Sequence, residues 1–140
     1  MKYIDNYRSC SRTFATLRIY PKSLHPSAIT EMLQIEPTDI SIKGGGPRGK
    51  FVNGWFLSTK DILNSRDSRR HIDWLIDQID QSADKIAYLF KNGTKIDICC
   101  YWGSKSGNGG PTLSPHQMKR LVKHNIEVWW DVYLEKDDDE

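Results

Sequence analysis

The fold is decided by one stretch of alternating residues, Arg12-Thr13-Phe14-Ala15-Thr16-Leu17-Arg18-Ile19-Tyr20. Successive side chains of a strand point to opposite faces, so the apolar side chains of Ala15, Leu17 and Ile19 share one face. The opposite face carries aromatic, hydroxyl and charged groups. The stretch therefore predicts a β-strand that is buried on one side only, and Pro21 ends it.

Strand and helix patterns alternate along the rest of the chain. They predict strands over residues 39–43, 54–59, 95–102 and 126–134. They predict helices over residues 26–34 and 67–80 and from Ser114 onward, while Ser82 is expected to cap a helical segment that Asn92-Gly93 ends. The order is β-α-β-β-α-(α)-β-α-β, which predicts an α+β domain with a mostly antiparallel or mixed five-stranded sheet and its helices on one face. A ferredoxin-like arrangement is one topology that fits this order.

The composition is that of one folded domain. A chain of 140 residues, 38% hydrophobic and 27% charged, suits a single core and excludes a disordered chain. Residues 1–140 are therefore assigned to one domain, with 1–11 as an N-terminal extension and 135–140 as a disordered acidic tail. An acidic arm for a basic partner is the other interpretation of that tail.

Charge, hydropathy and cysteine content limit the kinds of partner and the cellular location that we expect. A net charge of +2 gives no electrostatic argument for nucleic acid, so we do not expect it as a partner. No apolar run approaches the ~20 residues that span a membrane, and the first residues lack the apolar region of a signal peptide. The three cysteines, Cys10, Cys99 and Cys100, have no disulfide spacing, which predicts free thiols and a cytoplasmic location.

The glycine-rich run Gly44-Gly45-Gly46-Pro47-Arg48-Gly49-Lys50 has the letters of a phosphate-binding loop without its chemistry. Pro47 lacks an N–H, Phe51 stands where the metal-binding hydroxyl should be, and a strand follows instead of a helix. A looser role is left open, in which Arg48 and Lys50 contact an anionic group together with Asn108 of a second glycine-rich loop over 103–112. No cofactor is expected.

The sequence contains no catalytic or metal-binding motif. None of the four histidines has a partner at zinc-ligand spacing, and Asp67, His71 and Asp73 are interpreted as polar residues on a helix surface. A nucleophile elbow and a Cys/His signature are also absent. We therefore expect no metal ion and no catalytic residue, while an enzyme built from scattered residues stays open as an alternative.

The second face of the predicted sheet is the most informative feature for function. If helices cover the first face, the second shows aromatic rings together with arginine and carboxylate groups, a composition typical of protein interfaces. The candidate partner-binding residues are Arg18, Tyr20, Tyr101, Trp129, Asp131 and Tyr133. Two other interpretations are aromatic pairs that stabilise an open sheet and burial of this face under the N-terminal segment. A further one is base stacking as in sheet-type RNA binders, which Asp97, Glu127 and Asp131 would oppose by repelling a phosphate backbone.

Several short segments, in their order along the chain, resemble the bacterial family called domain of unknown function 4279. They are Ala15–Tyr20, Ile29–Leu33, Glu36–Thr38, Gly54-Trp55, Leu57-Ser58, His71–Gln78, Gly109–Ser114 and Asp131–Tyr133. The resemblance implies a fold unit covering residues 12–134. It implies no catalytic residue, because the family has no established activity. By analogy alone, small bacterial domains of this kind often lie beside toxin genes as immunity proteins.

Three hypotheses of function follow. The leading one is a non-enzymatic protein-binding module, such as an immunity-type inhibitor of a bacterial toxin, with a protein partner or a second copy on the open sheet face. The second is binding of a small ligand or nucleic acid by the glycine-rich loops, which a strong salt dependence would favour. The third is an unrecognised enzyme, which a deep pocket with a strongly shifted titratable group would favour.

Overall fold

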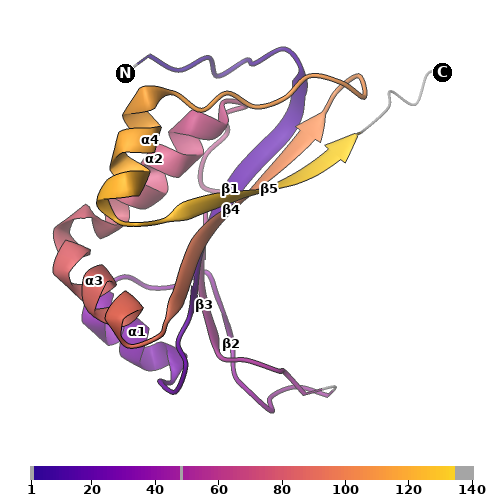
Figure 1. Ribbon diagram of the computed structural model, residues 1–140. Helices are drawn as coiled ribbons and strands as arrows, with labels where there is room; N and C mark the ends of the chain where they lie inside the picture. The colour runs from indigo at the N-terminus through magenta and orange to yellow at the C-terminus, as the bar shows by residue number, and fades with distance from the viewer. Residues whose placement is uncertain (1, 48, 135–140) are drawn as a thin grey trace.

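The computed structural model describes residues 2–47 and 49–134 (Figure 1). The predicted tail, 135–140, lies outside these residues. The strands are β1 (Cys10–Tyr20), β2 (Asp39–Ser41), β3 (Gly54–Ser58), β4 (Lys95–Ser104) and β5 (Glu127–Leu134). The helices are α1 (Pro26–Leu33), α2 (Ser68–Ile79), α3 (Ala83–Lys91) and α4 (Pro115–Lys123), with a 3-10 turn, η1 (Asp80–Ser82), between α2 and α3.

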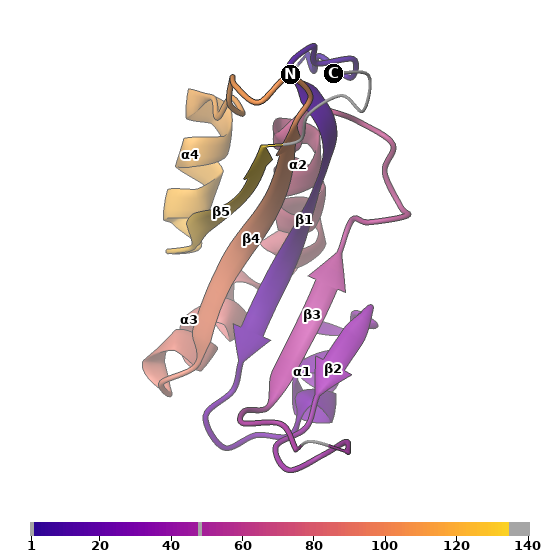
Figure 2. The same ribbon diagram turned by 90° about the vertical axis from the view of Figure 1, so that its right-hand side faces the viewer.

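The five strands form one mixed sheet in the order β2-β3-β1-β4-β5 (Figure 2). The pairs β2–β3, β3–β1 and β1–β4 are antiparallel, and only β4–β5 is parallel. The first four strands and their helices therefore have the strand order and directions of a ferredoxin-like domain. Helix α4 and strand β5 are added to it at the β4 edge. The predicted fold class and order of elements are confirmed.

All four helices pack on one face of the sheet (Figures 1 and 2). Leu17 of β1 and Ile98 of β4 lie opposite each other in register and are fully buried beneath Ile72 and Ile76 of α2. Each such side chain contributes roughly 1.5–3 kcal/mol when it leaves water. The core is thus a single layer between the helices and one side of the sheet. Among the described residues, no helix is both long and apolar enough to cross a membrane.

Helices α1 and α4 begin at side-chain caps, whereas α3 begins without one. His25 accepts a hydrogen bond from the Ser27 N–H at the start of α1, and Ser114 forms a capping box with Gln117 at the start of α4. The prediction that Ser82 caps α3 is wrong, because its side chain makes no cap bond. The chain passes from α2 through η1 into α3 with almost no break in its helical turns.

Helix α2 begins at a buried carboxylate that also holds the N-terminal segment. The Asp67 side chain is the N-cap, accepting from the backbone N–H of Arg69 at 3.0 Å and of Ile4 at 2.7 Å. It is paired with the Arg69 guanidinium at 2.7 Å. Burial opposes ionisation of Asp67, but these bonds outweigh burial and lower the pKa of its carboxyl group.

A second buried carboxylate, Asp73, joins three segments of the chain. It accepts hydrogen bonds from the Tyr3 hydroxyl at 2.6 Å, from Gln117 Nε2 at 2.7 Å and from Arg120 Nη1 at 2.9 Å. The interpretation of Asp67, His71 and Asp73 as surface residues is therefore wrong, since all three are buried. Their polar atoms are satisfied by segments distant in sequence, which a helix-surface pattern does not reveal.

Replacing Asp73 with alanine should destabilise the fold strongly. The change removes the acceptor of the Tyr3 hydroxyl and of Gln117 Nε2. It also removes one of the three carboxylates bonded to Arg120, and breaking such a buried charged network costs about 3–5 kcal/mol. Urea denaturation of the variant measures this loss, with the exposed Glu31→Ala as a matched control expected to stay within about 0.5 kcal/mol of wild type. Equal midpoints for Asp73→Ala and wild type would contradict the assignment.

Candidate functional site

The face of the sheet opposite the helices is uncovered in the described part of the chain (Figure 2). Phe14, Arg18 and Tyr101 are half-buried there, and Trp129 and Tyr133 are exposed. The N-terminal segment turns instead toward the helices, where Tyr3 bonds to Asp73. Burial of this face under the N-terminal segment, one of the alternatives considered from the sequence, is therefore excluded. We call this surface the open face.

Three aromatic rings stack across three neighbouring strands on the open face. Phe14 of β1 and Tyr101 of β4 lie opposite each other in register, and their ring centroids are 4.8 Å apart at an interplanar angle of 5°. Tyr133 of β5 stacks on the other side of Tyr101, at 4.9 Å. Gly103 lies opposite Tyr133 in register and has no side chain, so the Tyr133 ring leans over Tyr101 instead. The stack fixes three large rings face to face on one surface.

An ion pair lies on the same face, four residues further along β1 than Phe14. Arg18 Nε and Nη2 each donate to an oxygen of Asp97 at 2.7 Å, a bidentate geometry that restricts the guanidinium to one orientation. This bonding to Asp97 raises the pKa of Arg18. The same guanidinium lies 5.4 Å from the ring of Trp129 and 6.0 Å from that of Tyr20. Arg18 therefore joins three strands of the open face without presenting an unpaired charge.

The six candidate residues predicted for partner binding all lie on strands β1, β4 and β5, with their side chains on the open face. Tyr20 lies at the far end, where it contacts Phe56 edge-on at 5.7 Å. Asp131 lies opposite Tyr101 in register and is half-buried. The open face thus combines a fixed aromatic surface with one internal ion pair and few free charges, the composition of the centre of a protein interface.

The two glycine-rich loops lie at opposite ends of the sheet (Figure 1). The loop carrying Lys50 joins β2 to β3 near the Ile19 end of β1, whereas the loop carrying Asn108 follows Ser104, which pairs with Cys10 at the other end. Arg48 lies outside the described residues. A single site formed by Lys50 and Asn108 is therefore not present.

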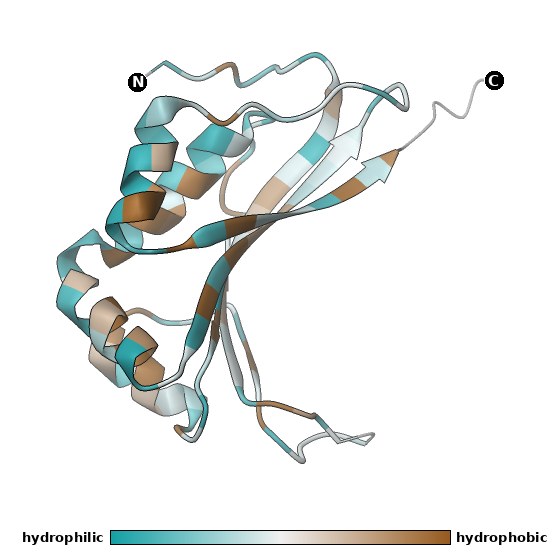
Figure 3. Cartoon of the chain, viewed as in Figure 1, coloured by the Kyte–Doolittle hydropathy of each residue, from teal (hydrophilic) through white to brown (hydrophobic). Residues whose placement is uncertain are grey.

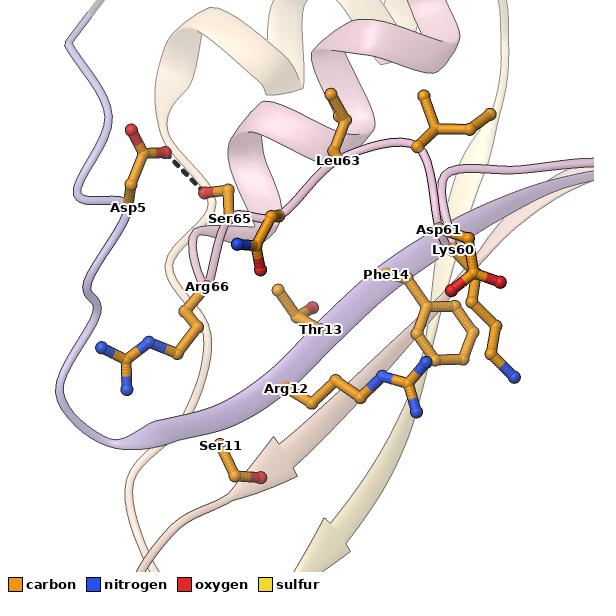
Figure 4. A pocket seen from close by; sticks show the side chains of 12 residues that line it. Asp5, Ser11, Arg12, Thr13, Phe14, Lys60, Asp61, Leu63, Ser65 and Arg66 are labelled. Atoms are coloured by element: carbon orange, nitrogen blue, oxygen red, sulfur yellow. Dashed lines mark hydrogen bonds between the residues drawn. The ribbon is translucent and has the colours of Figure 1, made fainter.

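A groove of about 600 Å³ lies where β1 extends past the end of β3. Residues 60–66 form its other wall, and Figure 4 shows its side chains. Arg12 and Lys60 lie 5.2 Å and 5.4 Å from the ring of Phe14, and Arg66 stands on the opposite side. Sequence reasoning missed this groove, because its two walls are about fifty residues apart and neither has a motif.

A buried histidine, His71, bonds to Thr59 and Ser65 and so fixes the segment that forms one wall of the groove. His71 Nε2 lies 2.7 Å from the Ser65 carbonyl oxygen, which can only accept, so Nε2 carries the proton. Nδ1 then accepts from the Thr59 hydroxyl at 2.6 Å. Burial lowers the pKa of His71 and favours this neutral form. Asp5 also bonds to Ser65, and the Arg70 guanidinium together with that hydroxyl lowers the pKa of Asp5.

The described residues contain neither a metal-binding cluster nor a disulfide. Within residues 2–47 and 49–134, no group of three or more His, Cys, Asp or Glu side chains is placed to hold a metal ion. None of the three cysteines forms a disulfide. Burial raises the pKa of Cys100 to about 12, so its thiol stays protonated and is shielded from reagents.

Comparison with protein-family models gives a match to the domain of unknown function DUF4279 over residues 10–135. The chain belongs to the DUF4279 family. The match runs from the first residue of β1 to the end of β5, so it includes every strand of the open face. The searches of curated proteins and of solved structures gave no match. The DUF4279 description assigns no activity to the family.

The groove wall should weaken as His71 becomes protonated. Because the folded pKa lies below the ordinary value of 6.5, the stabilisation is complete above that value and is lost as pH falls through the folded pKa, by up to about 1.4 kcal/mol per pH unit. Urea denaturation between pH 7.5 and 5.5 should show this loss in wild type, and a smaller loss in His71→Asn. Parallel pH dependences in the two proteins would show that His71 is not responsible.

Proposed function

We propose that this chain is a non-enzymatic protein-binding module whose contact surface is the open face. The observation that carries the proposal is that the stack of Phe14, Tyr101 and Tyr133 and the Arg18–Asp97 pair lie on one uncovered face. Rings that are already fixed lose little conformational freedom on binding, so their burial is converted efficiently into affinity. An inhibitor of the immunity type, which binds a toxin protein, is one form that such a module takes.

Two features of the open face support a protein as its partner. Trp and Tyr side chains dominate binding energy at protein interfaces because they bury a large apolar area and keep one polar group for hydrogen bonding. The guanidinium of Arg18 is already neutralised by Asp97, and the strands add the carboxylates of Glu127 and Asp131. Around β5 this charge pattern does not attract a phosphate backbone, so it favours a protein over a nucleic acid there. Arg12 and Lys60 add positive charge only beside Phe14.

The open face should lose its partner when its two exposed rings are removed. Wild type and Trp129→Ala/Tyr133→Ala are used to capture proteins from a lysate of the native host, and the captured proteins are quantified by mass spectrometry. Removal of two central rings costs at least about 2 kcal/mol when they are hot spots, so recovery of the partner should fall by more than about tenfold.

The matched control removes one exposed ring on the helix side of the molecule, Tyr88→Ala in α3. Tyr88 has the same exposed fraction as Trp129, 54%. Circular dichroism melting first establishes that both variants fold. A partner that is lost equally from both variants, or retained by Trp129→Ala/Tyr133→Ala, rules out the open face as its contact surface.

The groove supports a second candidate function, the binding of an anionic group. Arg12, Lys60 and Arg66 line it, and in the described part of the chain none of the three forms an ion pair with a carboxylate. Two carboxylates, Asp5 and Asp61, also line the groove, but Asp5 is already paired with Arg70. The excess of positive charge matches the chemistry of a phosphate or carboxylate ligand. This candidate replaces the glycine-rich loops as the place for such a ligand.

Titration with inorganic phosphate, followed by amide NMR shifts, tests the groove directly. We expect saturable shifts at residues 11–14 and 60–66, and an affinity lowered by about tenfold in Arg12→Ala, the usual effect of losing one charge-assisted hydrogen bond. Lys85→Ala on the exposed side of α3 is the matched control and should bind as wild type does. Shifts spread evenly over the surface, or an equal loss in Lys85→Ala, would reject the groove as a site.

A further inference from the structure

Strand β5 is rich in large apolar and aromatic residues, but none of them is fully buried. Its sequence is Glu-Val-Trp-Trp-Asp-Val-Tyr-Leu, and every residue is half-buried or exposed. Val132 and Tyr133 are 49% exposed and Leu134 is 65% exposed. In β1 and β4, by contrast, the residues that face the helices are buried. Figure 3 shows the hydrophobic bands of β5 continuing to its free end.

The outer edge of β5 is also unprotected. β5 is the last strand in the sheet order, and β2 at the other edge has only three residues. Proteins usually protect a long edge strand with lysine, proline or a bulge, because its unpaired backbone groups would otherwise bind another strand. β5 has no lysine and no proline, and its register with β4 runs without a shift over its whole length. Met118 and Val122 of α4 add exposed apolar groups to the helix side of the molecule.

The register determines which backbone groups of β5 point outward. Ala15 bonds through both its N–H and its carbonyl to Thr59 on the β3 side, so odd-numbered residues of β1 face β3 and even-numbered ones face β4. Even-numbered residues of β1 lie opposite odd-numbered residues of β4, so the even-numbered residues of β4 face β5. In the parallel β4–β5 pair, each of these bonds to the β5 residues on either side of its register partner, so the odd-numbered residues of β5 face β4. Even-numbered residues of β5, among them Val128 and Val132, therefore direct their N–H and carbonyl groups to the free edge.

We propose that the edge of β5 binds the β5 strand of a second copy of this chain, in antiparallel orientation about a two-fold axis at Trp130. An antiparallel pair matches residues whose backbone groups both face the partner strand. About this axis Val128 lies opposite Val132 of the second copy, and both are even-numbered. The pairing is isologous, so each β5 strand satisfies the edge of the other and neither β5 edge stays free.

The charges of β5 select this register. With the axis at Trp130, the carboxylates of Glu127 and Asp131 lie opposite aromatic residues of the second copy, Tyr133 and Trp129. Moving the two-fold axis by one residue, to Trp129, places Glu127 opposite Asp131 of the second copy. Moving the axis the other way, to Asp131, places Asp131 opposite Asp131 of the second copy. Like charges directly opposite each other in a sheet are destabilising, so both shifted registers are disfavoured.

This pairing goes beyond the proposed binding function and does not depend on it. It would bury the exposed apolar side chains on the helix side of β5, including Val132. It would also join the open faces of two copies into one continuous surface, with Trp129 and Tyr133 of both copies near its centre. A partner bound to the open face would then meet a surface with two-fold symmetry.

Sedimentation velocity from micromolar to millimolar concentration tests the pairing. Wild type should show a reversible monomer–dimer equilibrium, and Val132→Lys should raise the dissociation constant by at least about tenfold, since an edge lysine is a natural barrier to strand addition. Val132→Pro, which removes one outward N–H without adding charge, should do the same. Hydrogen exchange at the Val132 amide should be slow at high concentration and fast on dilution.

Two controls decide between this edge and other contacts. Val52→Lys changes an equally exposed valine, 50% against 49%, in the β2–β3 loop and should leave the dissociation constant unchanged. Phe14→Ala changes the open face and leaves the β5 edge intact. Wild type that is monomeric at millimolar concentration, or association that responds to Phe14→Ala or Val52→Lys instead of Val132→Lys, overturns the proposal. These outcomes leave the open-face experiment with its own variants unaffected.

Discussion

The buried carboxylate of Asp73 holds α4 in place, and α4 leads into the strand that completes the open face. It is an acceptor for Tyr3 and Gln117 and an ion-pair partner for Arg120, so it fixes the N-terminal segment and α4 against the same side of α2. Since α4 leads directly into β5, the placement of α4 also sets where β5 adds to the sheet. The open face therefore depends on a contact on the opposite side of the molecule. A buried charge with several partners is costly to break and specifies one arrangement, whereas apolar packing tolerates several.

The one-sided sheet explains the chemistry of the open face. Aliphatic residues on an uncovered face gain nothing from burial and invite aggregation. Aromatic rings stacked across strands gain contact with one another while one ring surface stays in water. The Arg18–Asp97 pair has the same character, because each side chain is about one quarter exposed and its charge is balanced within the sheet. The two interpretations of these residues are thus compatible: the aromatic pairs stabilise the open sheet, and they also form a rigid surface that a partner can contact.

The sequence predicted the parts of the fold that depend on local periodicity. The alternation of β1 and the apolar stripe of α2 predicted the correct elements, and the ferredoxin-like arrangement was one topology that fits their order. Residues whose role depends on distant segments were assigned wrongly or missed. His71 is polar and helical, so a pattern analysis places it on the surface, yet Thr59 and Ser65 satisfy both its ring nitrogens in the interior. The groove was missed for the same reason, since Arg12 and Lys60 meet only through the path of the chain after β3.

The fifth strand differs from the other four in what it contributes. Strands β1 to β4 already complete a ferredoxin-like sheet, and the buried core lies almost entirely on them and on the helices that cover them. β5 adds only Val128 and Trp130 to the border of that core, but it supplies the two most exposed aromatic rings of the open face. Hydrophobic residues on an edge strand carry a cost in solubility and in aggregation. A strand that contributes so little to the core and bears this cost is best explained by contacts made outside the single chain. The open face and the free edge of β5 are therefore two surfaces of one addition to the fold, and both point to association.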